Sequence, residues 1–167
     1  MNQNDLRLVI KLLLRMKTLF SKILVPIDGS EYSFSAAEYA IQISMKDKSH
    51  ITLLSILPSK LMHGDSSGIF GAIPPNYFKK YKNEAKKWFN RIIDKTKKDR
   101  LEIGKIKTDV ITTPLSIVSA IVEYADKDDM TLIIMGTRGI TGFKRMLLGS
   151  VASGVVTYAH CPVLVIR

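Results

Sequence analysis

Four short apolar runs and one alternating segment recur along this chain, and segments with helical spacing separate them. The apolar runs are residues 22–28, 50–56, 131–135 and 162–166, and residues 105–111 alternate well enough for a further strand. Runs of this length predict buried strands, and parallel strands need a crossover, usually helical, between them. The pattern therefore predicts an α/β fold, a three-layer α/β/α sandwich around a five-stranded parallel sheet. Strand orders 2-1-3-4-5 and 3-2-1-4-5 both fit, and in both the order reverses beside the first strand, where such sheets bind ligands.

The expected helices follow the strands. Ser30 has the side chain of a helix N-cap, and it precedes apolar residues spaced three or four apart. That apolar stripe consists of Phe34, Ala37, Ala40, Ile41 and Met45. Pro114 suits a first helical position, so we expect a helix from there to residue 125, and a last short helix over residues 150–159. Strand and helix patterns thus alternate to the end of the chain.

The length and composition indicate a single domain with a real core. The chain has 167 residues, of which 46% are hydrophobic. No apolar run approaches the roughly 18 residues of a membrane span, because Arg7, Lys11 and Arg15 interrupt the N-terminal stretch. That stretch also lacks the pattern of a secretory signal, so we expect a cytoplasmic protein. The lone cysteine, Cys161, and three histidines offer neither an internal disulfide nor zinc-site spacing.

Residues 1–17 are expected to form an extension to a domain at 18–167. They combine apolar residues with cations four apart, which is typical of a helix that lies on a membrane surface or on a partner. Alternatively, Met16 is the true initiator, and the preceding residues are an artefact or a disordered extension. The sequence leaves both interpretations open.

The middle of the chain predicts a flexible flap over residues 57–75, which contain several Gly and Pro, and then a basic amphipathic helix over residues 76–100. The formal net charge is +10, and much of that surplus lies between Lys79 and Lys107. A solvated helix face explains this better than a nucleic-acid site, because acidic residues interleave with the lysines. Binding of nucleic acid or of an acidic membrane surface is thus less favoured, although neither is excluded.

Residues 136–150 are rich in glycine and join an uncharged strand to a helix. Their spacing is Gly136-x2-Gly139-x9-Gly149-Ser150. Glycine lets the backbone approach a ligand closely, and N–H groups at the start of a helix bind phosphate oxygens. The spacing fits neither the P-loop nor Gly-x-Gly-x-x-Gly. A plain turn and a polyphosphate site are about equally compatible with this loop.

The same spacing resembles the ATP-binding signature of the universal stress protein family. Residues 22–30 resemble that family's first strand, and residues 161–166 its last strand. Together these motifs imply a universal stress protein domain of the ATP-binding branch, with strand order 3-2-1-4-5. The resemblance also implies a homodimer paired through the final strand, Val163–Ile166. A strand so poor in charge would invite such pairing in any case.

The resemblance further implies which residues hold the nucleotide. Pro26 and Asp28 would border the adenosine, and the backbone of Ile56 would contact adenine. The ribose and phosphates would lie along Met135, Gly136, Thr137, Arg138, Gly139 and Gly142, and the phosphate cradle would be completed by Gly149, Ser150 and Val151. The family often has a hydroxyl residue after that valine, where Ala152 stands here, so one phosphate contact is in doubt. Asp28 is equally explained as a turn cap or as a ribose or metal contact.

The function expected from these features is a regulatory module of the stress response that binds ATP, or another adenine nucleotide, with or without Mg²⁺ or Mn²⁺. No general base stands near the expected γ-phosphate, so we expect no catalytic residues and at most weak hydrolysis. Two alternatives remain: a slow Mg²⁺-dependent ATPase or phosphotransferase, and a nucleic-acid-binding module that uses residues 79–107. No metal ligands can be assigned from the sequence.

Overall fold

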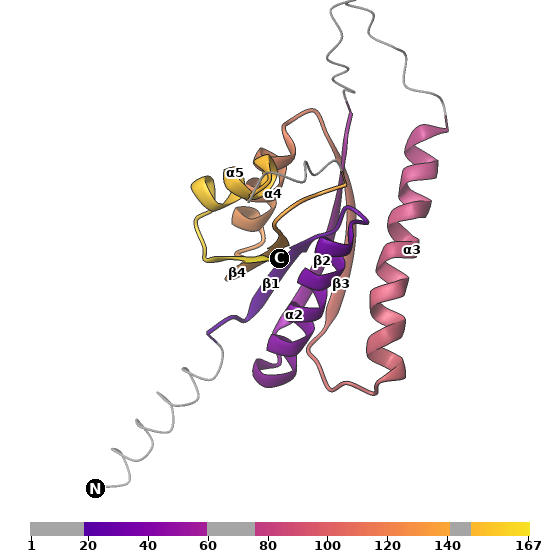
Figure 1. Cartoon of the computed structure of the whole chain (residues 1–167), viewed down its shortest axis with the longest axis vertical. Helices are drawn as coiled ribbons and strands as arrows, with labels where there is room; N and C mark the ends of the chain where they lie inside the picture. The colour runs from indigo at the N-terminus through magenta and orange to yellow at the C-terminus, as the bar shows by residue number, and fades with distance from the viewer. Residues whose placement is uncertain (1–18, 60–75, 141–147) are drawn as a thin grey trace, which may run out of the picture.

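A computed structural model describes residues 19–59, 76–140 and 148–167. Strands and helices alternate along the chain (Figure 1). Their bounds are β1 Lys22–Pro26, α2 Glu31–Asp47, β2 His50–Pro58, α3 Tyr77–Lys98, β3 Ile106–Thr113, α4 Ile117–Lys127, β4 Leu132–Gly136, α5 Ser150–Tyr158 and β5 Val163–Ile166. The strands form one parallel sheet of order β3-β2-β1-β4-β5. The predicted fold class is confirmed, and of the two strand orders the sheet has 3-2-1-4-5.

Two helices cover each face of the sheet (Figure 1). Alternate residues of a strand point to opposite faces, so Ile23 and Val25 of β1 pack beneath α2 and α3, while Leu24 packs beneath α4 and α5. These three side chains are fully buried. A strand buried on both faces has no solvent side, which is why β1, β2 and β4 read as continuous apolar runs rather than as alternating ones.

Ser30 caps α2 as predicted, because its hydroxyl accepts the N–H of Ser33 at 3.2 Å. The other end of α2 is fixed by a buried hydroxyl. Ser44 Oγ donates to the carbonyl of Ser49 at 2.7 Å and accepts the N–H of Gly104 at 2.9 Å. One side chain thereby joins α2 to the segments that lead into β2 and β3. Met45, predicted for the apolar stripe, is instead 43% exposed, since the buried side of this end of α2 is formed by Ile41 and Ser44.

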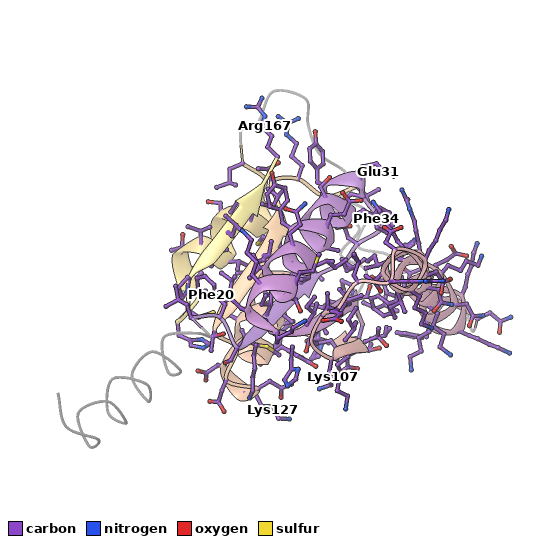
Figure 2. All side chains as sticks on the ribbon, turned by 90° about the horizontal axis from the view of Figure 1, so that it is seen from below. Phe20, Glu31, Phe34, Lys107, Lys127 and Arg167 are labelled. Carbon is purple, nitrogen blue, oxygen red and sulfur yellow. The ribbon has the colours of Figure 1, made fainter. Side chains whose placement is uncertain are left out.

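The aromatic stripe of α3 packs into the core, and part of its basic surface pairs with acidic residues. Phe89 is buried in the cluster shared with α2 and β1. The Arg91 guanidinium lies 4.0 Å from the centre of the Phe34 ring and pairs with Glu31 at 3.2 Å. Glu31 and Phe34, both labelled in Figure 2, are thus on the side of α2 that faces α3. Exposed pairs of this kind contribute little free energy, so apolar burial is what holds α3 in place.

Strand β2 runs two residues further than predicted, to Pro58, so the expected flap cannot begin at residue 57. Proline lacks an N–H, yet it is tolerated here. Ile51 and Ser59 donate toward β3, so residue 58 has its backbone nitrogen on the side of β1, which has already ended at Pro26. No ladder hydrogen bond is lost at that position. The rest of the predicted flap, residues 60–75, lies outside the described residues.

Pro114 does not open a helix, contrary to the prediction. Thr113 Oγ1 accepts the N–H of Leu115 at 3.0 Å, which forms a turn, and α4 begins only at Ile117. Ser116 caps it by accepting the N–H of Ser119 at 3.0 Å. A hydroxyl that satisfies a helix-terminal N–H here outweighs the preference of proline for the first helical position.

In the part of the chain that the structure describes, no helix is long and apolar enough to cross a membrane. The expected extension at residues 1–17 and the predicted site residue Gly142 both lie outside that part.

Candidate functional site

A cavity of about 550 Å³ opens at the carboxyl ends of the strands, where the order of the sheet reverses between β1 and β4. It reaches from the ends of β1, β2 and β4 to the first turn of α5 and to α3. The crossovers on either side of this reversal leave the sheet in opposite directions, so the strand ends are not covered there.

Nearly all the residues predicted for the site surround this one cavity, from four separate parts of the chain. They are Pro26, Asp28, Ile56, Met135, Gly136, Thr137, Arg138, Gly139, Gly149, Ser150 and Val151. Gly142 lies outside the described residues. Ala152, where the family often has a hydroxyl residue, also lines the cavity and is only 2% exposed.

The sequence analysis missed a second group of lining residues. They are Ile27, Ser33, Leu54, Leu57, Pro58, Tyr77, Tyr81, Ile117, Ile121 and Ile140. Most of the aliphatic members come from regular strands and helices, whereas Ile27 and Ile140 lie in the segments that follow β1 and β4. Nothing in the sequence distinguishes those in strands and helices from ordinary core residues. The two tyrosines had a weak signal, since each has a polar hydroxyl within an otherwise apolar helical stripe.

Glycines make room at the mouth of the cavity. A Cβ at Gly136 would lie 2.6 Å from Cβ of Tyr32, and one at Gly139 would lie 2.7 Å from Oδ2 of Asp28. At Gly149 a Cβ would lie 3.0 Å from the carbonyl of Thr137, which already accepts the Gly149 N–H at 2.7 Å. The loop that follows β4 and the start of α5 therefore approach each other backbone to backbone.

The start of α5 presents polar groups to the cavity. Gly149 is the N-cap and provides no side-chain hydrogen bond, and Ser150 and Val151 of the first turn line the cavity. Beside them, the Thr137 hydroxyl is buried and has no hydrogen-bond partner among the described residues, and Thr137 is 8% exposed. A buried hydroxyl without a partner costs free energy. A helix start next to such a hydroxyl fits a ligand with anionic oxygens, which accept hydrogen bonds from both.

Asp28 is a turn cap, as one of its two interpretations predicted. Its Oδ1 accepts from the N–H and the hydroxyl of Ser30, at 3.0 and 2.6 Å. Its Oδ2 accepts the N–H of Ile140 at 3.3 Å, across the cavity mouth. Beyond this, the Arg138 guanidinium lies 5.9 Å from the centre of the Tyr32 ring, which places a positive charge at the same rim.

Tyr81 closes the opposite side of the cavity. Its hydroxyl donates to the carbonyl of Ile56 at 3.0 Å and lies 3.0 Å from Ser55 Oγ. Burial raises the pKa of Tyr81 above the ordinary tyrosine value. The ring of Tyr81 also packs edge-on against Trp88, with 5.9 Å between ring centres.

The residues that the structure describes contain no group of three or more His, Cys, Asp or Glu side chains placed to hold a metal ion. A cation at this cavity would therefore need oxygens from a bound ligand in addition to the Asp28 carboxylate.

The fold and the cavity together define a doubly wound, Rossmann-like α/β protein with its open cavity at the strand-order reversal. The model described as the universal stress protein family matches residues 19–167. Universal stress protein YxiE of Bacillus subtilis is 30% identical over 149 residues, which cover 89% of this chain and 100% of that protein. Universal stress protein MJ0531 of Methanocaldococcus jannaschii is 35% identical over 152 residues, which cover 90% of this chain and 84% of that protein. The chain therefore belongs to the universal stress protein family.

Solved structures agree with this assignment. Universal stress protein UspA from Lactobacillus plantarum superposes with a TM-score of 0.71 at 25% identity, covering 89% of this chain and 98% of that one. Two more distant members, each 19% identical, were solved as nucleotide complexes. One contains cAMP, with a TM-score of 0.66 and coverage of 90% and 99%. The other, from Archaeoglobus fulgidus, contains dAMP, with a TM-score of 0.64 and coverage of 90% and 100%.

Proposed function

We propose that this protein binds ATP in the cavity at the strand-order reversal and acts as a nucleotide-dependent regulatory module of the stress response. The observation that carries the proposal is the partnerless hydroxyl of Thr137 beside the first turn of α5. Buried polar groups in folded proteins are nearly always hydrogen-bonded, so this one indicates an acceptor that the described residues do not provide. Phosphate oxygens are such acceptors, and the N-terminus of α5 favours their charge.

The walls of the cavity suit the remainder of a nucleotide. Leu54, Ile56, Met135, Ile117 and Ile121 form an apolar surface, against which a flat base can pack. Phosphates would lie at the start of α5, where Ser150 and Val151 of the first turn offer backbone N–H groups. The volume of about 550 Å³ is within the range of sites for small molecules and cofactors.

The solved relatives with cAMP and dAMP support an adenine nucleotide in particular. These two ligands share an adenine ring and a phosphoryl group, and the cavity here offers an apolar wall for the first and a helix N-terminus for the second. ATP extends the same ligand by further phosphates, for which the glycines at 136, 139 and 149 leave room beside the backbone.

Binding without fast turnover is the form of activity that we propose. Among the described lining residues, Asp28 is the one carboxylate, and both of its oxygens already accept hydrogen bonds from Ser30 and Ile140. Removal of a proton by Asp28 would compete with these turn contacts, which argues against its use as a general base. We therefore propose that nucleotide occupancy itself is the signal.

Calorimetric titration with ATP tests this proposal. Gly149→Val places a branched side chain where even a Cβ would lie 3.0 Å from the Thr137 carbonyl, and Ser150→Glu adds a negative charge at the helix start. Each should weaken ATP binding about tenfold or more. Ser153→Glu, exposed on the same helix and absent from the cavity lining, is the matched control and should bind like the parent protein. Unaltered affinity in both site variants would contradict the proposal.

We further propose that the protein works in the cytoplasm. We also propose that two copies of this chain pair through β5. Strand β5 is an edge of the sheet and has no charged side chain, whereas β3, at the other edge, presents Lys107 to solvent. Charged residues protect an exposed edge against pairing, so β5 is the edge left available. Around it, Leu164, Val156 and Tyr158 are exposed by 37%, 49% and 70%.

A further inference from the structure

The ion pairs that α3 forms within the described residues all lie along one side of the helix, the side that faces α2. The pairs are Lys87–Glu84, Arg91–Glu31 and Lys95–Glu38, at 2.8, 3.2 and 2.5 Å. Their three cations follow one another at intervals of four residues and so form one row. Two of the three acidic partners belong to α2. The positive charge on this side of α3 is therefore offset where the two helices meet.

The opposite side of α3 has a second row of cations, which form no ion pair with the described residues. This lysine row consists of Lys79, Lys82, Lys86 and Lys97, all of them exposed. Intervals of three and four residues keep the first three on one side of the helix, and Lys97 follows five turns after Lys79. At 1.5 Å per residue the row is about 27 Å long. Figure 2 shows α3 at the side of the molecule, with nitrogen-tipped side chains extending outward from it.

Acidic residues interleave with the lysines of α3 along the sequence, but they do not surround the lysine row in space. The two acidic residues within α3 are Glu84 and Asp94. Glu84 lies in the paired row, and Asp94 lies near the far end, three residues before Lys97. No acidic residue stands three or four positions from Lys79, Lys82 or Lys86. The interleaving that favours a merely solvated face is thus missing from the first half of the row.

The start of α3 is also an unfavourable place for these charges. Positive charge opposes the dipole at a helix N-terminus, and like charges three or four residues apart repel each other. Lys79 is the third residue of α3, the first turn has no acidic residue, and Asn76 at the N-cap makes no side-chain hydrogen bond. Acidic residues would serve solubility at least as well here. Charges that oppose the preference of their own helix indicate recognition of an anionic partner.

We propose that the lysine row docks on the phosphate backbone of double-stranded DNA without reading its sequence. Duplex DNA has one negative charge per about 1.7 Å of its axis, so a straight row about 27 Å long meets several phosphates. Lysine contacts phosphate as a point charge, and phosphate contacts carry no sequence information. The formal net charge of +10 favours the approach of such a polyanion.

Other anionic partners fit this surface less well. Helices that lie on membranes insert apolar side chains, yet α3 contributes none of the large hydrophobic side chains that are exposed in the described residues. Single-stranded nucleic acids bind by stacking on aromatic rings, and by the same observation α3 exposes no such ring. Lysine is depleted in protein–protein interfaces. A rigid duplex is the partner that requires only the charge that the lysine row provides.

Fluorescence anisotropy of a labelled duplex tests the proposal. A duplex of mixed sequence and about 20 base pairs should bind the parent protein, and four phosphate contacts predict a slope of about −3 to −4 for log affinity against log salt concentration. Lys82→Gln/Lys86→Gln should weaken binding about tenfold or more at about 50 mM salt, and it should make the slope shallower by about 2.

A matched variant controls for net charge. Lys46→Gln/Lys127→Gln removes two charges at exposed positions outside α3 and should bind the duplex as the parent does. Lys82→Gln/Lys86→Gln should melt no lower than the parent, because two repelling charges are removed, so its loss of binding is not a loss of folding. Neither Lys82 nor Lys86 lines the cavity, so the affinity of this variant for ATP should equal that of the parent.

Several results would overturn the inference. A parent protein that does not bind the duplex at low salt has no such surface. Equal losses in the two double variants would show that net charge alone attracts DNA. Tighter binding of the matching single strand, or of phosphatidylserine vesicles, would replace duplex DNA by another partner. These outcomes leave the proposed nucleotide site untouched, since that site is tested separately by calorimetry with ATP.

Discussion

The carboxylate of Asp28 accepts the backbone N–H of Ile140 at 3.3 Å and thereby joins the turn after β1 to the loop after β4. Its other oxygen accepts both the N–H and the hydroxyl of Ser30, the N-cap of α2. Because the two segments border the same cavity, this side chain sets the distance between two of its walls. Asp28 thus supports the cavity whether or not it touches a ligand.

Replacing Asp28 by alanine should lower the free energy of unfolding by about 1–3 kcal/mol, because three donors lose a charged acceptor. Urea denaturation followed by circular dichroism measures the change. Asp94→Ala, at an exposed position of α3, is the control and should alter stability by no more than about 0.5 kcal/mol. Equal stabilities for the two variants would show that the Asp28 contacts contribute nothing.

The turn after β1 also provides a spectroscopic test, because Gly29 lies directly beneath Trp88. Gly29 has a φ of +87°, and a Cβ there would lie 2.6 Å from the indole. Gly29→Ala should therefore destabilise the protein by about 1–3 kcal/mol through backbone strain and overpacking. It should also change the emission of Trp88, the one tryptophan of the chain, by pushing the ring toward water.

Lys46→Ala, on the exposed last turn of α2, is the control for this substitution and should leave both stability and emission unchanged. If Gly29→Ala keeps the parent's emission maximum and stability, that result would contradict the close contact between Gly29 and the indole of Trp88.

The fold was largely predictable because its signals are local. Strands such as β4, with no charge, and caps such as Ser30 are determined by neighbouring residues, and both predictions are confirmed. The prediction for Pro114 was wrong because two hydroxyls, of Thr113 and Ser116, competed with it for the same helix start. Periodicity alone does not rank such competing local signals.

The cavity was predictable in part. The spacing of Gly136, Gly139 and Gly149 indicated a loop whose backbone can approach a ligand closely, and the structure brings these residues to one cavity. What holds them there was not visible in the sequence. The contact of Tyr81 with Ile56 joins residues 25 apart, and its geometry depends on where α3 settles over the sheet. That position is set by the packing of Phe89 and its neighbours, a tertiary effect.

Stability should fall at alkaline pH through Tyr81 and Tyr124. Burial raises the pKa of both, and the hydrogen bond that Tyr124 donates to Asp109 at 3.0 Å raises its pKa further. The unfolded chain therefore ionises first, near the ordinary tyrosine pKa of about 10. The stabilising contribution is complete below that pH and is lost as the pH rises through the higher folded-state values.

Urea denaturation at pH 8 and at about pH 11 measures this loss. The double variant Tyr81→Phe/Tyr124→Phe should lose less stability between the two pH values than the parent, because phenylalanine does not ionise. Tyr158→Phe, whose side chain is 70% exposed, is the control and should decline as the parent does. A double variant that declines as steeply as the parent would rule out these two rings as the cause.

The proposed dimer gives the last prediction. Leu164 is 37% exposed on the free edge of β5, and Leu164→Lys would place a charge in the middle of an interface formed by two such edges. Burying an unpaired ammonium group is costly, so the variant should be monomeric at micromolar concentration, where the parent should have twice the mass of one chain by light scattering. Leu115→Lys, 43% exposed just before α4, makes the same chemical change away from β5 and should remain dimeric.

If Leu164→Lys stays dimeric, or if both variants dissociate, β5 is not the contact. If the parent protein is itself monomeric, the proposed dimer is wrong. The proposed nucleotide site is unaffected by that result, because every described residue that lines the cavity belongs to a single chain.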